Sequence, residues 1–249
     1  MPDPVNADRI VHGGTGYAIS TNDGRETYKK ALDPDLPPEI ECMIPDGSIY
    51  SHYSYCVTMT SRGCPRGCPW CHVGAKEGKQ ARKTGDLYDF YSGQKEIVSL
   101  DANLTACPDK RDLFAQYAAT GAVVDFSQGL DIRLLDGNDV DALNRMRLKQ
   151  LHFAWDNPRE DLKSRFADYA KAARHKPHGA YASVYILTNY NSTMAENLER
   201  IYTLRDMGYD PDVRIYDKPH APHELLRLQR WCNNRQIFKK CRRFEDYYD

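Results

Sequence analysis

The stretch Tyr55-Cys-Val-Thr-Met-Thr60, followed by Ser61-Arg-Gly-Cys64-Pro-Arg-Gly-Cys68-Pro-Trp70-Cys71-His72, joins a strand-like run to a cysteine-rich segment. The first six residues are mostly β-branched, aromatic or apolar, which is typical of a short buried strand. The prolines and glycines after them indicate an irregular loop, where backbone N–H groups can point at a ligand. The sequence therefore predicts a strand that ends in a loop able to hold a bound group.

Five further runs of strand-forming residues follow this first strand, and stretches of helical period separate them. The expected strands are 55–60, 96–100, 123–126, 151–155, 183–187 and 213–216, and the expected helices are 110–119, 139–147, 159–174, 193–207 and 222–233, with a less regular helical pattern at 84–92. Strands and helices in alternation are typical of βα units around a parallel sheet. The chain is therefore predicted to be an α/β protein whose ligand-binding loops meet at the carboxyl edge of one sheet.

Both ends of the chain differ from this alternating middle. Residues 1–50 contain six prolines and the cluster Gly13-Gly14-Thr15-Gly16, which predicts an extended arm that lies against a core of residues 51–220. Residues 221–249 are predicted to be a basic helical extension, because no acidic residue stands between Glu224 and Glu245. The aromatic residues in this extension suit two arrangements: an amphipathic helix that packs them on the core, which we favour, or a platform for nucleic-acid bases.

The composition excludes several classes of protein. Hydrophobic residues make up 41% of the 249 residues and charged residues 28%, which is typical of a globular chain and not of a disordered one. The formal net charge of -1 leaves no global field to attract nucleic acid or an anionic membrane. No apolar run approaches the roughly 18 residues of a membrane span, and the first residues lack the features of a signal peptide. We therefore expect a cytoplasmic protein that does not bind membranes.

Eight cysteines are present, and three of them, Cys64, Cys68 and Cys71, fall within eight residues. In a reducing compartment such crowding indicates a metal site more than disulfides, because adjacent thiolates repel each other unless a cation lies between them. Three thiolates on one loop can bind three irons of a four-iron, four-sulfur cube and leave the fourth iron open. An open iron can bind a small molecule and pass it an electron.

The C-x3-C-x2-C spacing, Trp70 before the last cysteine and the position after the first strand resemble the radical S-adenosylmethionine (SAM) superfamily. The segments Ser99-Leu-Asp-Ala-Asn103, Gln128-Gly-Leu-Asp-Ile-Arg133 and Phe153-Ala-Trp-Asp156 are similar to its cobalamin-associated subgroup, and the resemblance covers roughly residues 50–218. About fifty residues precede the first strand, which is too few for a cobalamin-binding domain. We therefore expect no bound cobalamin.

The resemblance implies a partial (β/α)6 TIM-type barrel with the cluster and SAM at the carboxyl ends of its strands. Cys64, Cys68 and Cys71 would bind a 4Fe-4S cluster, and reductive cleavage of SAM would yield a 5′-deoxyadenosyl radical that abstracts hydrogen from a substrate. An external one-electron donor such as flavodoxin or ferredoxin is implied. The sequence identifies neither the substrate nor a residue that acts on it; for a nucleotide or nucleic acid, the basic extension is the first place to expect contacts.

In place of the glycine-rich GGE signature that holds the SAM amino group in family members, this chain has Asp101-Ala-Asn103. Carboxylate and amide oxygens can accept hydrogen bonds from an ammonium, so Asp101 and Asn103 are expected to replace that signature. The other candidates are Trp70 as a shield of the cluster, Arg133 for the SAM carboxylate, Asp156 for ribose hydroxyls, and Thr188 and Asn189 for adenine or ribose. Asp131 and Asp156 could equally cap the loops after their strands, and Arg133 could form a structural ion pair.

Other uses of the cysteines stay open at this point. A zinc site completed by His72 or another cysteine, in a module whose basic tail binds nucleic acid, is the main alternative. Cys68-Pro-Trp-Cys71-His72 also fits covalent haem attachment, which would require export, and Cys68 with Cys71 alone would fit a thioredoxin-like pair. An iron–sulfur electron carrier without SAM chemistry is a further possibility.

Overall fold

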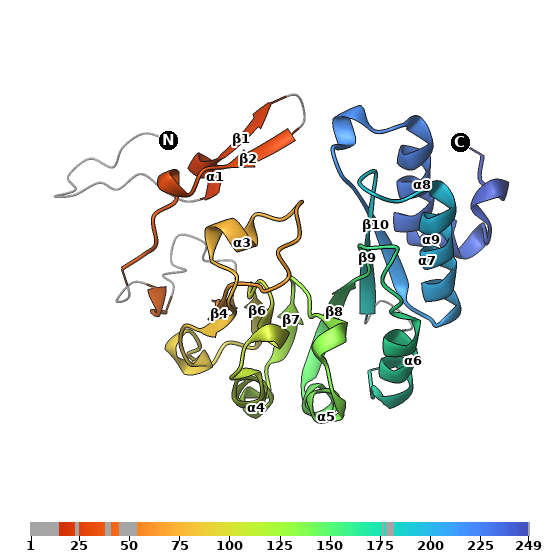
Figure 1. Cartoon of the computed structure of the whole chain (residues 1–249). Helices are drawn as coiled ribbons and strands as arrows, with labels where there is room; N and C mark the ends of the chain where they lie inside the picture. The colour runs from red at the N-terminus through yellow and green to blue at the C-terminus, as the bar shows by residue number, and fades with distance from the viewer. Residues whose placement is uncertain are drawn as a thin grey trace.

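The computed structural model describes residues 15–22, 25–37, 41–44, 54–175, 177 and 182–248, and its centre is a sheet of six parallel strands. The strands lie in the order β10-β9-β8-β7-β6-β3 across the sheet (Figure 1). Their bounds are Tyr55–Thr58 (β3), Glu96–Ser99 (β6), Val123–Phe126 (β7), Arg147–Ala154 (β8), Ala182–Thr188 (β9) and Asp210–Ile215 (β10). The predicted α/β chain with a six-stranded parallel sheet is therefore confirmed.

Helices that follow the strands cover one face of this sheet. They are α4 (Lys110–Thr120), α5 (Gly137–Arg145), α6 (Lys163–Ala172) and α7 (Met194–Asp206), and they lie on the same outer side of the sheet in Figure 1. Every second strand residue points at them and is buried, as Val124 and Phe126 are in β7. The ring of Phe126 meets Tyr117 of α4 with centroids 5.3 Å apart, and Phe153 meets Tyr169 of α6 at 5.0 Å. The core thus lies between the sheet and these four helices, and it continues into the C-terminal segment through residues such as Leu228 and Trp231.

The opposite face of the sheet is polar, and a bulge in β8 shapes it. Val124 pairs with Leu148 and Asp125 pairs with Gln150, so Lys149 is an extra residue in β8. A bulge re-aims the side chains that follow it, and this one turns Gln150 and the alternating residues after it away from the helices. We call this surface the polar face; it comprises Asp125, Gln150, His152, Ser183, Tyr185, Asp212 and Arg214.

Three of the predicted helices differ from the observed ones. The helix expected from residue 139 begins two residues earlier, because Asp136 is its N-cap. The Asp136 side chain accepts from the Asp139 N–H, and the Asp139 side chain accepts from the Asp136 N–H. The helix expected from residue 159 begins at Lys163, after a turn in which the Glu160 N–H donates to the Asn157 carbonyl. The helix expected at 84–92 is wrong, because only the 3-10 turn Leu87–Asp89 forms there.

The N-terminal arm contains a small hairpin beside the segment that follows β3. It consists of α1 (Thr15–Ala18), β1 (Ile19–Asn22) and β2 (Arg25–Tyr28), and it is drawn above α3 (Val73–Lys76) in Figure 1. The Lys76 ammonium donates to the Thr15 hydroxyl at 2.5 Å, and the Lys30 ammonium donates to the Lys76 carbonyl at 2.9 Å. The arm therefore contacts α3; residues 1–14, which include Gly13 and Gly14, and residues 38–40 and 45–53 lie outside the described residues.

After β10 the chain forms α8 (His223–Asn233), α9 (Arg235–Lys240) and the 3-10 turn Phe244–Asp246. Trp231, Phe238, Phe244 and Tyr247 are buried, whereas Tyr248 is 83% exposed. The basic extension therefore turns most of its aromatic rings inward, as an amphipathic segment does. Within the described ranges, no helix has both the length and the apolar character that crossing a membrane requires.

Candidate functional site

The cysteine loop, residues 63–72, is held at its base by a two-stranded hairpin. β4 (Ser61–Arg62) pairs antiparallel with β5 (Arg82–Lys83). Gly63 has a φ of +86°, and a Cβ atom there would lie 2.1 Å from the Gln80 carbonyl oxygen, so only glycine fits. The Cys64 N–H then donates to the Gly78 carbonyl at 3.2 Å. The hairpin therefore fixes where the loop begins.

Asp101 anchors the base of the cysteine loop. Its Oδ1 atom accepts from the Thr60 hydroxyl at 3.0 Å, from the Ser61 hydroxyl at 2.8 Å and from the Ser61 N–H. Its Oδ2 atom accepts from the Ser99 hydroxyl at 2.7 Å. Burial raises the pKa of this carboxyl group, and the four donors oppose the rise. Because the donors come from β6 and from the start of β4, Asp101 ties the cysteine loop to the neighbouring strand.

The three thiols of the cysteine loop are free, and they lie near enough to influence one another's charge. Cys64 and Cys68 are half-buried and Cys71 is exposed. Burial raises the pKa of Cys68 and of Cys71, and the negative charges of the other cysteines and of Asp156 raise it further. A cation bound to the thiolates would reverse this rise. Among the described residues, no group of three or more His, Cys, Asp or Glu side chains is arranged to hold a metal ion.

Asn103 contacts the first sulfur of the loop. Its Nδ2 atom donates to the Cys64 Sγ at 3.3 Å, and its Oδ1 atom accepts from the Thr105 hydroxyl at 2.7 Å. The Thr105 oxygen in turn accepts from the Asp131 N–H at 2.9 Å, so the Thr105 proton points to Asn103 and fixes the amide orientation. Asn103 is therefore oriented as a donor to a sulfur that we predicted to bind metal.

Two arginines and two carboxylates connect the cysteine loop to the ends of β7 and β8. Arg66 of the loop donates to Glu160 at 2.7 Å, and Glu160 also accepts from Arg133. The Arg133 Nε donates to the Asp131 Oδ1 at 2.6 Å. The Asp131 Oδ2 is buried without a hydrogen-bond partner in the described part of the chain, and it lies 3.9 Å from the Arg66 Nε. The loop after β3 is thereby fixed to two later strands.

Aromatic side chains extend this connection to β9 and β10. Trp70 packs edge-on against Tyr190 with ring centroids 5.0 Å apart, and Tyr190 packs in the same way against Tyr216 at 5.0 Å. Tyr190 follows β9 and Tyr216 follows β10, whereas Trp70 belongs to the loop after β3, at the opposite edge of the sheet. The cysteine loop therefore crosses the carboxyl edge of the sheet.

Asp156, Thr188 and Asn189 stand at the carboxyl ends of β8 and β9. The Leu187 N–H donates to the Asp156 Oδ1 at 3.1 Å, and burial raises the pKa of this carboxyl group. The Asp156 Oδ2 and the Asn189 Oδ1 accept no hydrogen bond from a described residue, so both are available to a ligand. Thr188 is fully buried, and its hydroxyl donates to the Arg214 carbonyl at 3.3 Å.

The sequence prediction did not include two residues that organise this edge. Buried Arg200 of α7 donates to the carbonyls of Trp155 at 2.6 Å, Asp156 at 3.0 Å and Leu187 at 3.3 Å, which joins the ends of β8 and β9. Its burial lowers its pKa to about 10. In the sequence it is one of many charged residues in an amphipathic helix, so no signal marks it. Glu160 had a signal, because it is an acidic residue shortly after a predicted strand.

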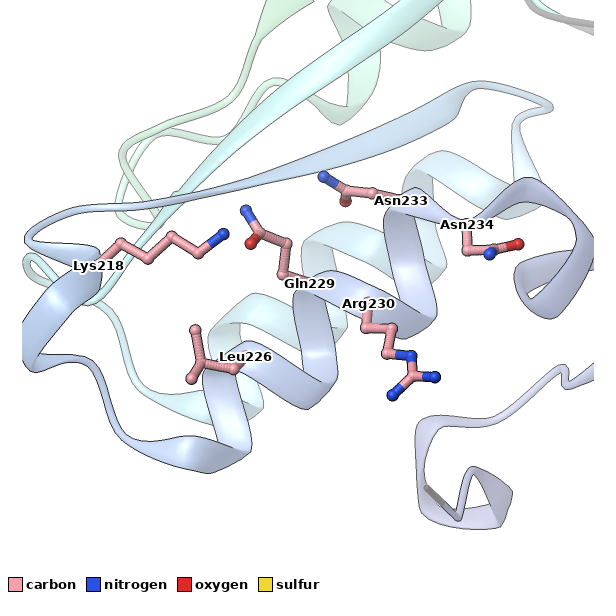
Figure 2. Close-up of a pocket in the computed structure, with 6 residues that line it drawn as sticks. All are labelled: Lys218, Leu226, Gln229, Arg230, Asn233 and Asn234. Carbon is pink, nitrogen blue, oxygen red and sulfur yellow. The ribbon is translucent and has the colours of Figure 1, made fainter.

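The structure also has an open groove of about 520 Å³ along α8 (Figure 2). Its lining residues are Lys218, Leu226, Gln229, Arg230, Asn233 and Asn234. The amides among them already have partners: Gln229 Nε2 donates to the Val213 carbonyl at 2.8 Å, and Asn234 accepts from two N–H groups of α9. No cysteine lines this groove, and its amides are used in hydrogen bonds within the protein.

Comparison with known proteins leaves the site to be interpreted from its own chemistry. No protein-family model matches the chain, and no curated protein matches it either. The arrangement of the cysteine loop at the carboxyl edge of the sheet is therefore the ground for a proposed function.

Proposed function

We propose that the chain is a radical SAM enzyme, built as a partial (β/α)6 barrel, that binds a 4Fe-4S cluster and SAM at the carboxyl edge of its sheet. The observation that carries the proposal is the cysteine loop, with three free thiols in C-x3-C-x2-C spacing directly after the first parallel strand. Three thiolates suit three irons of a cube and leave the fourth for a small ligand. Asn103 supports this assignment, because hydrogen bonds to sulfur tune such clusters.

The path of the cysteine loop supports a curved sheet. In a flat sheet, at about 4.8 Å per strand, β3 and β9 would lie about 19 Å apart. Trp70 nevertheless contacts Tyr190 at the end of β9, and Arg66 contacts Glu160 beyond β8. Curvature toward a partial barrel shortens the distance that the loop has to cover. It also gathers the strand ends around one site, as ligand sites in parallel α/β proteins require.

The groups left without partners at this edge suit the functional groups of SAM. The chemistry that a bound cluster and SAM supply is reductive carbon–sulfur cleavage followed by hydrogen abstraction. The buried Asp131 Oδ2, which accepts no hydrogen bond from a described residue and has only the Arg66 Nε 3.9 Å away, suits the amino group, and the Arg133 Nη2, which donates to no described residue, suits the carboxylate. The free Asp156 oxygen suits ribose hydroxyls. Asp101 and Thr188, which bond within the protein, position the loop and β9.

Exclusion of water and access for electrons complete the proposed site. Trp70, Tyr190 and Tyr216 form a row of rings beside the loop; Tyr190 is exposed, and the half-buried Trp70 and Tyr216 would limit the access of water to a reactive intermediate. Cys71 is exposed, so one side of the loop is left open to an external one-electron donor such as flavodoxin or ferredoxin.

Anaerobic reconstitution with iron and sulfide tests the proposal. We expect a brown protein with about four irons and four sulfides per chain, and 5′-deoxyadenosine when dithionite and SAM are added. Alanine at Cys64, Cys68 or Cys71 should abolish both, whereas Cys241→Ala, in the C-terminal segment, should change neither. A colourless protein with about one zinc would overturn the proposal in favour of a zinc-binding module. A brown protein that never yields 5′-deoxyadenosine would leave only an electron carrier.

A further inference from the structure

We infer that the polar face of the sheet binds a small neutral molecule that presents a hydrogen-bond donor and an acceptor side by side, as nucleobases and carboxamides do. The binding groups are Gln150 and the cluster of His152, Ser183 and Tyr185. The inference depends on neither an iron–sulfur cluster nor SAM.

A cavity of about 250 Å³ lies against this face, between β8, β9, β10 and the adjoining ends of α8 and α9. At about 30 Å³ per water, it has room for roughly eight waters, which suits a small molecule and not a polymer. The charged groups of its lining cancel: Arg214 pairs with Asp212 at 3.1 Å, and Arg235 pairs with Asp210 at 3.5 Å. The cavity therefore favours a neutral ligand.

His152, Ser183 and Tyr185 have hydrogen-bonding groups that the protein does not use. The His152 Nδ1 lies 2.6 Å from the Ser183 hydroxyl oxygen and 3.0 Å from the Tyr185 hydroxyl oxygen. One ring nitrogen offers either a single lone pair or a single N–H, so it cannot accept both hydroxyl protons. At least one hydroxyl proton and the His152 Nε2 thus have no partner among the described residues. The imidazole stacks on the Tyr185 ring with ring centroids 5.3 Å apart, which holds these side chains in place.

Gln150 supplies the recognition element. Its amide makes no hydrogen bond to any residue that the structure describes, although the side chain is half-buried and lines the cavity. The amide is therefore open to the cavity and can bond to a ligand there. The bulge at Lys149 is what turns Gln150 toward the cavity, and bulges are frequent beside functional sites. A glutamine amide pairs in two-point fashion with any group that offers an adjacent donor and acceptor, as it does with adenine.

The neighbouring strand shows the same lack of partners. Asp125, the register partner of Gln150, has a buried Oδ1 atom without a hydrogen-bond partner among the described residues. This contrasts with the α8 groove of Figure 2, where Gln229 and Asn234 are already bonded within the protein. Unpartnered polar groups therefore gather at the polar face, and those of Gln150 and His152 line the cavity.

Binding is tested on the full chain, without added SAM, by saturation-transfer NMR and calorimetry. The probes are adenosine and cytidine for the nucleobase source and nicotinamide for the carboxamide source. We expect one class to bind and to shift the His152 side-chain nitrogen resonances. Gln150→Leu should weaken that binding at least tenfold, and Gln150→Glu, which keeps the size but loses the amide donor, should weaken it too. Gln236→Leu, at an exposed position on α9, is the matched control and should bind as wild type does.

Two results would overturn the inference: no binding by any of the three probes, or equal binding by wild type and a folded Gln150→Leu variant. Circular dichroism and the midpoint of thermal unfolding establish whether each variant is folded, and Gln150→Glu serves if the leucine variant is not. Because the binding experiment involves neither an iron–sulfur cluster nor SAM, a negative result contradicts only the proposed ligand site in the cavity. Absence of 5′-deoxyadenosine in the reconstitution experiment speaks only against the proposed function.

Discussion

Replacing Asp101 with alanine should loosen the base of the cysteine loop and destabilise the whole fold. The carboxylate accepts four hydrogen bonds, from Thr60, twice from Ser61, and from Ser99, and it is 2% exposed. Alanine leaves the buried Ser61 N–H without a partner, which costs about 1–3 kcal/mol. The three hydroxyls lose about 1 kcal/mol each, although they can rotate to other acceptors.

The gain from no longer burying a carboxylate offsets part of this loss, so the net destabilisation should be about 3 kcal/mol. Asparagine keeps the Oδ1 atom and its three donors, and Asp101→Asn should therefore cost only about 1 kcal/mol. Because asparagine keeps the side-chain volume, the cost of Asp101→Asn reports the lost charge and the Ser99 hydrogen bond, and the additional cost of alanine reports the three Oδ1 hydrogen bonds together with the lost volume.

Urea unfolding followed by circular dichroism measures this effect. With a slope of about 3 kcal/mol per molar urea, the midpoint of Asp101→Ala should fall by about 1 M. Asp141→Ala, at an exposed position on α5, is the matched control and should stay within about 0.5 kcal/mol of wild type. Reconstituted Asp101→Ala should also bind less iron than wild type. A destabilisation below about 1 kcal/mol with full iron content would refute the anchoring role.

Three further variants probe single contacts. Asn103→Leu removes the donor to the Cys64 sulfur, so the reduction potential of a bound cluster should fall by about 40 mV, the equivalent of about 1 kcal/mol for one electron; an EPR-monitored titration with an unchanged potential would contradict this. Burial lowers the pKa of His152 below 6.5, so the unfolded chain takes up this proton at a higher pH than the folded one. The neutral imidazole therefore contributes its full stabilisation above about pH 6.5, and this contribution is lost as the pH falls toward the folded pKa. Wild type should lose free energy of unfolding between pH 7.5 and pH 5.5, and in urea unfolding His152→Gln should lose less of it, by up to about 1 kcal/mol. Arg200→Met leaves three carbonyls at the ends of β8 and β9 without a donor and should cost about 3 kcal/mol, and a thermal midpoint within 2 °C of wild type would be inconsistent with that role.

The strands could be predicted because apolar β-branched runs are what a parallel sheet buries, and Val123–Phe126 matches to the residue. β8 begins four residues before its prediction, because Arg147, Lys149 and Gln150 are polar and no apolar run marks them. The bulge that places Lys149 breaks the alternation on which strand prediction depends. The capping pair Asp136 and Asp139 was readable in the sequence and accounts for the early start of α5.

The candidate site was partly predictable for a different reason. Cysteine spacing is a local property, so Cys64 and its two companions could be singled out without a fold. The contact of Arg66 with Glu160 joins residues 94 positions apart, and no spacing in the sequence indicates which loops meet. Asn103 was expected at the site as an acceptor for the SAM amino group, whereas in the structure it donates to the Cys64 sulfur. The sequence does not indicate this contact, because the orientation of the Asn103 amide depends on how the surrounding loops pack. The predicted SAM contacts of Arg133 and Asp156 stay predictions.

The tie between Arg66 and Glu160 also bears on the order in which the protein assembles. Closing a contact across 94 residues carries a large entropy cost, which is recovered only after the intervening strands have paired. The cysteines are made early during synthesis, yet their loop reaches its final path only once β8 is in place. A nascent chain therefore exposes its thiols before the scaffold exists, and the final path of the cysteine loop is among the last parts of the molecule to form.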